Sequence, residues 1–152
     1  MVKADLVNTK EYFDIWQDYR SAESVGADFL DRLDTAKVPV TDAYWAMSDD
    51  GEQRELFIAT PLHDRDGIRK TAGIFHNILY TMTDEERAGF TLSDVAIVSP
   101  LSKNVSAIRQ RYGTVNYGSG RRVHRLDNLF NEPFIYRLNQ PVPNVLESTT
   151  NA

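Results

Sequence analysis

Two short apolar segments, 39 residues apart, share one pattern of apolar and polar positions. They read Phe57-Ile58-Ala59-Thr60-Pro61-Leu62 and Ala96-Ile97-Val98-Ser99-Pro100-Leu101. Each runs through strand-forming residues to a hydroxyl residue, a proline and a leucine. A segment with helical periodicity follows each, as is typical of buried strands that enter a helix. We therefore predict two neighbouring, parallel strands that end at one edge of a sheet, where such sheets commonly bind ligands.

Four segments have apolar side chains spaced three and four positions apart, the periodicity of an amphipathic helix. The first is capped by Asn8 or Thr9 and extends to residue 19, and the others cover residues 21–36, 68–82 and 100–112. Ser99 is the predicted N-cap of the last helix, which ends at Gly113. The capping box Thr83-Asp84-Glu85-Glu86 predicts one further helical turn.

Five segments read as strands: residues 43–47, 55–60, 95–98, 121–130 and 134–138. An Asp50-Gly51 turn joins the first two in an antiparallel hairpin. The glycine-rich Tyr117-Gly118-Ser119-Gly120 is a predicted loop. The resulting order is α-α-β-β-α-β-α-β-β, which predicts an α/β or α+β fold. We expect a mixed sheet of about five strands with helices packed on it.

Three parts of the chain also resemble one protein family. They are Tyr44-Trp45 with Leu56-Phe57-Ile58-Ala59-Thr60-Pro61-Leu62, then Leu92-Ser93-Asp94-Val95-Ala96-Ile97-Val98-Ser99-Pro100, and finally Phe134-Ile135-Tyr136-Arg137-Leu138. Over residues 43–138 they are similar to a family of small uncharacterised bacterial α/β proteins. The resemblance implies an α/β fold and suggests no activity.

The length of 152 residues and the apolar content of 41% fit one globular domain. We place that domain at residues 1–139 and expect the polar, proline-containing residues 140–152 to form a flexible tail. The absence of cysteine excludes disulfides, thiolate metal sites and a cysteine nucleophile. No apolar run approaches the length of a membrane helix, and the acidic N-terminal residues lack the apolar core of a signal peptide. We therefore expect a cytoplasmic protein with no membrane contact.

The net charge of −5 is unevenly distributed. Residues 1–60 hold 13 acidic and 6 basic side chains, whereas residues 103–125 hold 6 basic and no acidic ones. The basic segment contains Arg109, Arg121, Arg122 and Arg125, interleaved with tyrosines, and could bind phosphates and stack a base. It could equally pair with the acidic first sixty residues, within one chain or in a homodimer. We favour the pairing, because it needs no partner and suits the negative total charge.

The predicted edge of the sheet carries a first set of candidate catalytic residues. His63, Asp64 and Asp66 follow the first of the two matched strands, and His63 with Asp66 could serve as acid and base or hold a divalent cation. Their spacing matches no established metal-binding motif, so we expect no metal. The alternative that we favour is a polar loop in which an aspartate stabilises the start of the next helix.

A second set, Thr60, Ser99, Ser102 and Lys103, could bind an anion. If the two matched strands are neighbours, these side chains and the start of the helix after Ser99 would gather in one place. The favoured alternative is that Thr60 and Ser99 only cap helices. Since the chain has no glycine-rich phosphate loop, we expect neither a nucleoside triphosphate nor another cofactor.

Three functions remain open at this point. Because the chain contains no recognised catalytic constellation, we favour a non-catalytic protein-binding or regulatory module, whose partner is another protein or a second copy. One alternative is a small enzyme or ligand-binding domain for a phosphate-containing molecule, which requires the edge residues to converge in one concave site. The other is nucleic-acid binding through residues 103–125.

Overall fold

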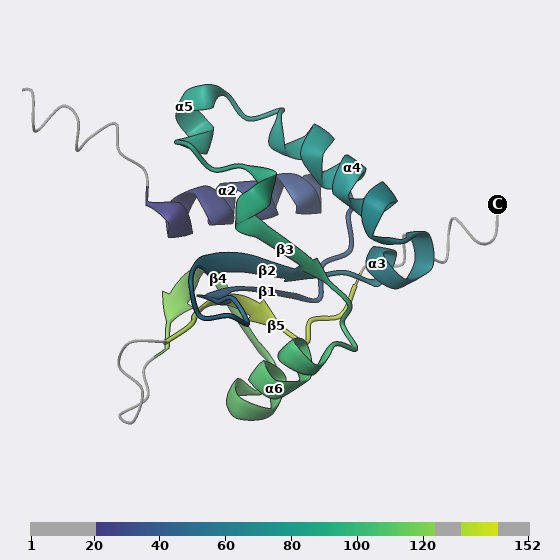
Figure 1. Ribbon diagram of the computed structural model, residues 1–152, viewed down its shortest axis with the longest axis vertical. Coiled ribbons are helices and arrows are strands. Elements are labelled where there is room, and N and C mark those ends of the chain that lie inside the picture. Colours follow the sequence, from purple (N-terminus) through teal and green to yellow (C-terminus); the bar gives the residue numbers. More distant parts are fainter. Residues whose placement is uncertain (1–20, 124–131, 143–152) are drawn as a thin grey trace, which may run out of the picture.

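The computed structural model describes residues 21–123 and 132–142. They form an α+β fold in which helices cover both faces of a five-stranded mixed sheet (Figure 1). The strands are β1 (Asp42–Met47), β2 (Arg54–Ala59), β3 (Val95–Val98), β4 (Val115–Arg122) and β5 (Phe134–Leu138), in the spatial order β3-β2-β1-β5-β4. Among these strands, β2 and β3 pair in parallel and the other neighbours pair antiparallel. The predicted mixed sheet of about five strands is confirmed.

The two matched segments lie side by side, as predicted. Ile58 of β2 is opposite Ile97 of β3, and the amide of Thr60 donates to the carbonyl of Val98 (3.1 Å) just beyond the strands. The expectation that both are buried is correct only for β2. Because β3 is an edge strand with one neighbour, its four residues are half-buried, whereas Ile58 is fully buried.

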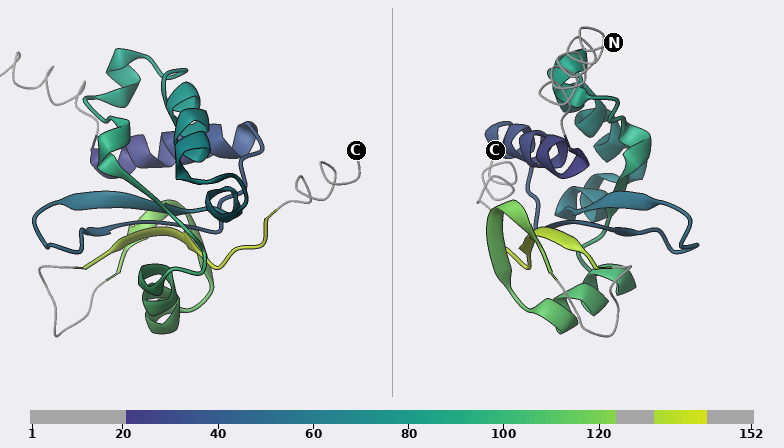
Figure 2. Two further views of the ribbon diagram at one scale, coloured as in Figure 1. Left: turned by 45° about the vertical axis from the view of Figure 1, so that its right-hand side comes forward. Right: turned by 90° about the vertical axis from the view of Figure 1, so that its left-hand side faces the viewer.

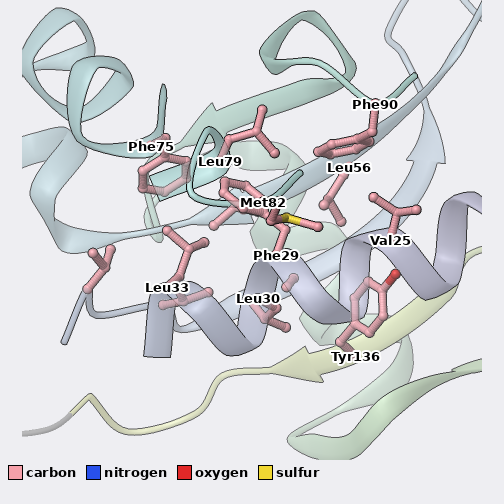
Figure 3. Packing of buried hydrophobic residues seen from close by; sticks show 14 of the residues in the cluster. Val25, Phe29, Leu30, Leu33, Leu56, Phe75, Leu79, Met82, Phe90 and Tyr136 are labelled. Carbon is pink, nitrogen blue, oxygen red and sulfur yellow. The ribbon is translucent and has the colours of Figure 1, made fainter. Parts of the chain in front are cut away.

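One face of the sheet, which we call the α2 face, is covered by α2 (Ala22–Thr35) and α4 (Ile68–Leu79) (Figures 1 and 2). Ser21 caps α2 by accepting from the amide of Ser24 (3.1 Å). The ring of Phe29 meets Phe75 edge-on and Phe90 at a tilt, with centroids 6.0 and 5.9 Å away (Figure 3). This packing is the main core. The predicted capping box also forms, at the start of α5 (Asp84–Arg87).

The opposite face, which we call the α6 face, is covered in the described part of the chain by one helix, α6 (Lys103–Tyr112) (Figure 2). The buried apolar cluster on this face consists of Tyr44, Phe57, Ile135 and Leu138. The predicted cap at Ser99 is wrong, because Ser102 caps α6 by accepting from the amide of Val105 (3.4 Å). The chain makes one turn first, with the amide of Ser102 donating to the carbonyl of Ser99 (3.1 Å).

Two other predicted segments differ in the structure. The supposed polar loop at residues 63–66 lies in a short helix, α3 (Pro61–Asp66), which is capped by Thr60 and begins at Pro61. The supposed glycine-rich loop at residues 117–120 lies within β4. A side chain at Gly120 would overlap the ring of Phe134, so the glycine lets β4 pass close to β5.

Some predictions fall wholly or partly outside the described residues. The helix at residues 8–19 lies outside, and so does most of the strand at residues 121–130, of which Arg121 and Arg122 belong to the end of β4. In the expected tail, the backbone amide of Gln140 donates to the carbonyl of Thr41. Its side-chain amide donates to the carbonyls of Val115 and Leu138. Within the described ranges, no helix is long and apolar enough to cross a bilayer.

Candidate functional site

At the edge where β2 and β3 end, Thr60 has a structural role. Its side chain is fully buried, and its hydroxyl oxygen accepts from the amide of Leu62 (3.2 Å) in the first turn of α3. This is the capping alternative. A buried, hydrogen-bonded hydroxyl is not accessible to a ligand at the surface.

Next to it, His63, Asp64 and Ser99 form a chain of hydrogen bonds. The Ser99 hydroxyl donates to Asp64 Oδ2 (2.7 Å), and Asp64 Oδ1 lies 3.1 Å from Nδ1 of His63. The bonds to Ser99 and His63 lower the pKa of Asp64. In a serine hydrolase, histidine lies between serine and aspartate and takes the serine proton. Here the carboxylate lies in the middle, so Ser99 has no histidine base and the three residues tie α3 to the end of β3.

The remaining edge residues do not join this group. Both oxygens of Asp66 are hydrogen-bonded to the guanidinium of Arg65, which lowers the pKa of Asp66. Ser102 caps α6, and Lys103 is exposed. None of the cavities described below is lined by His63, Asp66 or Lys103, and the described part of the chain holds no cluster of metal-ligating side chains.

In the basic segment, Arg109 forms a forked ion pair with a buried carboxylate. Its Nε and Nη2 donate to the two oxygens of Asp42 at 2.9 and 2.6 Å. Asp42 is fully buried, and also accepts from the amide of Asn139 (2.9 Å) and the hydroxyl of Thr41 (2.6 Å). The hydrogen bonds to Asp42 raise the pKa of Arg109. This pair fixes α6 to β1 and to the end of β5.

The other predicted arginines of this segment differ in their contacts. Arg122 pairs with Glu23 (3.2 Å) and Glu132 (3.4 Å), so both Arg109 and Arg122 bind acidic residues of the first sixty. Arg121 is exposed, with its guanidinium carbon 5.5 Å from the ring centroid of Tyr117. Arg125 lies outside the described residues. For Arg109 and Arg122 the structure therefore shows the pairing within one chain.

The sequence did not point to the hollow beside α6, which we call the α6 groove. An open hollow is bordered, among the described residues, by Ala107, Gln110, Arg111 and Tyr112 of α6. An inner cavity of about 180 Å³ shares three of these residues, and extends beneath the helix to Ala46, Ile108 and Pro133. Tyr44 and Asn104 form its polar end, where the tyrosine hydroxyl bonds to the Asn104 side-chain oxygen.

Tyr44 contributes only as a neutral donor, because burial and the nearby Asp42 charge raise the pKa of its hydroxyl. Arg111 is exposed and forms no ion pair among the described residues. The sequence signal for it was the basic segment 103–125, which contains no acidic residue. This pattern cannot distinguish Arg111, which lines the groove, from Arg109, which is ion-paired with Asp42.

Comparisons with models of known protein families, with curated proteins and with solved structures found no match. The resemblance noted from the strand sequences therefore stays a prediction.

Proposed function

We propose that this protein is a non-catalytic binding module that recognises an acidic segment of a partner protein in the α6 groove. The observation that carries the proposal is the inner cavity beside α6 and the open hollow next to it, both lined by Arg111, whose guanidinium has no ion-pair partner within residues 21–123 and 132–142. A guanidinium binds a carboxylate through two parallel hydrogen bonds. The groove thus has one group suited to an acidic side chain.

The walls of the groove favour a peptide over a bare ion. Ala46, Ile108 and Pro133 give the inner cavity an apolar lining, and Tyr112 adds an aromatic ring with a polar end. Grooves that bury apolar side chains and place a few charged groups at the rim are typical of peptide recognition. We therefore expect an acidic residue at Arg111 and an apolar side chain in the inner cavity.

The edge of the sheet supports the non-catalytic part of the proposal. Thr60 and Ser102 cap helices, Asp66 is held by Arg65, and Ser99 donates to a carboxylate. Each of these groups already has a structural partner. An enzyme for a phosphate-containing molecule would need them to face one cavity instead.

Nucleic-acid binding is the second candidate, because Lys103, Arg111 and Arg121 are exposed and no acidic residue lies between positions 103 and 123. Against it, Arg109 and Arg122 are neutralised within the chain. Phosphate contacts make such binding strongly salt-dependent, so the two candidates separate in one experiment.

The test measures binding of fluorescent peptides by anisotropy and maps the site by amide chemical shifts. The probes are a Leu- and Glu-containing peptide, the same peptide with Gln for Glu, and a single-stranded oligonucleotide. We expect only the acidic peptide to bind, with shifts at Ala107, Gln110 and Tyr112, and Arg111→Glu to abolish binding. The matched control is Arg69→Glu, which changes an exposed arginine of α4 on the other face.

Equal binding of the acidic and amide peptides, or unchanged binding by Arg111→Glu, would overturn the proposal. Salt-sensitive binding of the oligonucleotide that requires Arg111 would replace it with the nucleic-acid function.

A further inference from the structure

A separate cavity of about 300 Å³ lies on the α2 face, between the start of α2, the β1–β2 hairpin and the segment after α5. Its apolar walls are Val25, Trp45 and Phe90, and its charged lining includes Arg54 and Arg87. Val25 and Phe90 are labelled in the close-up of the core (Figure 3). Pockets of this size, mostly apolar with a few polar groups, are typical of small-molecule sites. We call it the Trp45 cavity.

Arg54 has hydrogen-bonding capacity that the described part of the protein does not use. Its Nη1 donates to Oε1 of Glu23 (2.8 Å), but its Nη2 is buried and has no partner there. Glu23 Oε1 is already shared with Arg122 (3.2 Å), and Asp94, which also lines the cavity, accepts from the amide of Thr91 (2.8 Å). A buried donor without an acceptor is rare in folded proteins, because it loses its hydration without gaining a hydrogen bond. An anion in the cavity would supply the missing acceptor after a turn of the Arg54 side chain, because Nη2 is shielded from solvent in the observed conformation.

One further feature favours negative charge in the same cavity. Ala22, the first residue of α2, lines it, so the positive end of the α2 dipole lies at its wall. Arg87 also lines the cavity, but its guanidinium is already ion-paired with Asp84. The acidic residue of the lining is Asp94, whose carboxylate accepts a hydrogen bond from the amide of Thr91 in the turn before β3.

The aromatic wall is held in place. Trp45 Nε1 donates to the hydroxyl of Tyr136 (2.9 Å), and the Trp45 ring meets Phe90 edge-on with centroids 6.0 Å apart. The guanidinium carbon of Arg54 lies 5.4 Å from the centroid of the Trp45 ring. A flat apolar group beside this wall would place an attached carboxylate next to Arg54.

From this geometry we infer that the Trp45 cavity binds a small carboxylate with an apolar or aromatic body. The carboxylate pairs with Arg54, and the body lies against Val25, Trp45 and Phe90. The site is separated from the α6 groove by the sheet and does not depend on the function proposed for that groove.

Trp45 itself supplies the signal for the test. The chain has two tryptophans, so Trp16→Phe leaves Trp45 as the sole tryptophan. In this background, phenylacetate is titrated against the emission of Trp45, with phenylacetamide and inorganic phosphate as matched probes. We expect a saturable change with phenylacetate, and at least tenfold weaker binding of the neutral amide and of phosphate.

Arg54→Lys keeps a cation beside Glu23 but removes Nη2, and we expect it to weaken phenylacetate binding at least tenfold. Arg69→Lys, on the exposed side of α4, is the matched control and should leave binding unchanged. Circular dichroism confirms that each variant is folded. No saturable change in the folded protein, equal binding of acid and amide, equal binding of phosphate, or unchanged binding by Arg54→Lys would overturn the inference.

Discussion

The two faces of the sheet are built in different ways. The α2 face is covered by two helices and is filled by a continuous apolar cluster that includes Phe29, Phe75 and Phe90. Within the described residues, the α6 face has one short helix, fewer buried apolar residues and a buried ion pair between Asp42 and Arg109. Among the described residues, apolar packing under two helices closes one face, whereas the other face combines a smaller apolar cluster with a polar tie.

A bulge in β5 changes which face of the sheet its last residues contact. The register between β1 and β5 shifts between Ala43 and Tyr44, which leaves Tyr136 as an extra residue. Tyr136 packs in the cluster of the α2 face, while Ile135 and Leu138 pack on the α6 face. Strict alternation would have placed Leu138 with Tyr136, so the bulge restores an apolar residue to the thinner side.

The sharpest contrast between the faces is expected from deleting an aromatic ring of the main core. Phe29→Ala should lower the free energy of unfolding by about 3–5 kcal/mol, because the side chain is fully buried between other rings. Ile108→Ala, in half-buried contact on the α6 face, should cost less than about 2 kcal/mol. Urea denaturation of both variants measures the two values, and equal losses would mean that the faces contribute alike.

The polar tie of the α6 face is tested at Asp42. Asp42→Asn should destabilise the protein by about 3 kcal/mol, because Arg109 loses its charged partner within a buried pair. The double variant Asp42→Leu/Arg109→Leu should be more stable than either single leucine variant, since no unpaired charge remains. If the losses simply add, the pair does not tie α6 to the sheet.

Within the α2 face, the matched residues Ile58 and Ile97 compare a central strand with an edge strand. Ile58→Ala should cost about 2–5 kcal/mol because the side chain is fully buried. Ile97→Ala should cost only about 1 kcal/mol, because β3 is half-buried and its lost contacts are fewer. Chemical denaturation of both variants would contradict this ranking if Ile97→Ala were the more damaging.

The smallest expected effect is a dependence of stability on pH at Glu23. Burial alone would raise the pKa of this carboxyl, but its hydrogen bond to Arg54 and the charges of Arg54 and Arg122 lower it below 4.5. A lowered folded pKa gives stability that is present above the unfolded pKa and is lost as the pH falls through the folded pKa.

Glu23→Gln should therefore reduce stability at pH 7 and flatten its loss below about pH 4.5. The control is Glu85→Gln, at an exposed carboxyl of α5. Melting temperatures between pH 7 and pH 3 measure both, and identical pH profiles for Glu23→Gln and the parent protein would contradict the role of this ion pair.

Much of the fold could be predicted because its signals are local. The helical periodicity of residues 21–36 and 68–82, the Asp50-Gly51 turn and the capping box at Thr83 each act within a few residues of backbone. The matched strands could be placed side by side because their common pattern implied a common direction. The glycines of β4 misled the prediction, since the reason for Gly120 lies in the ring of Phe134 on another strand.

The sequence by itself determined most of the helices and strands, the mixed sheet and the unequal distribution of charge, because hydrogen-bond periods and side-chain alternation are set along the chain. Only the tertiary structure decided which arginine pairs with a buried carboxylate and which lines a groove. Arg109 meets Asp42 across 67 positions, whereas Arg111, two residues later, faces an open groove. Roughly half a turn of α6 separates these outcomes, and which side of the helix meets the sheet depends on contacts between residues far apart in sequence.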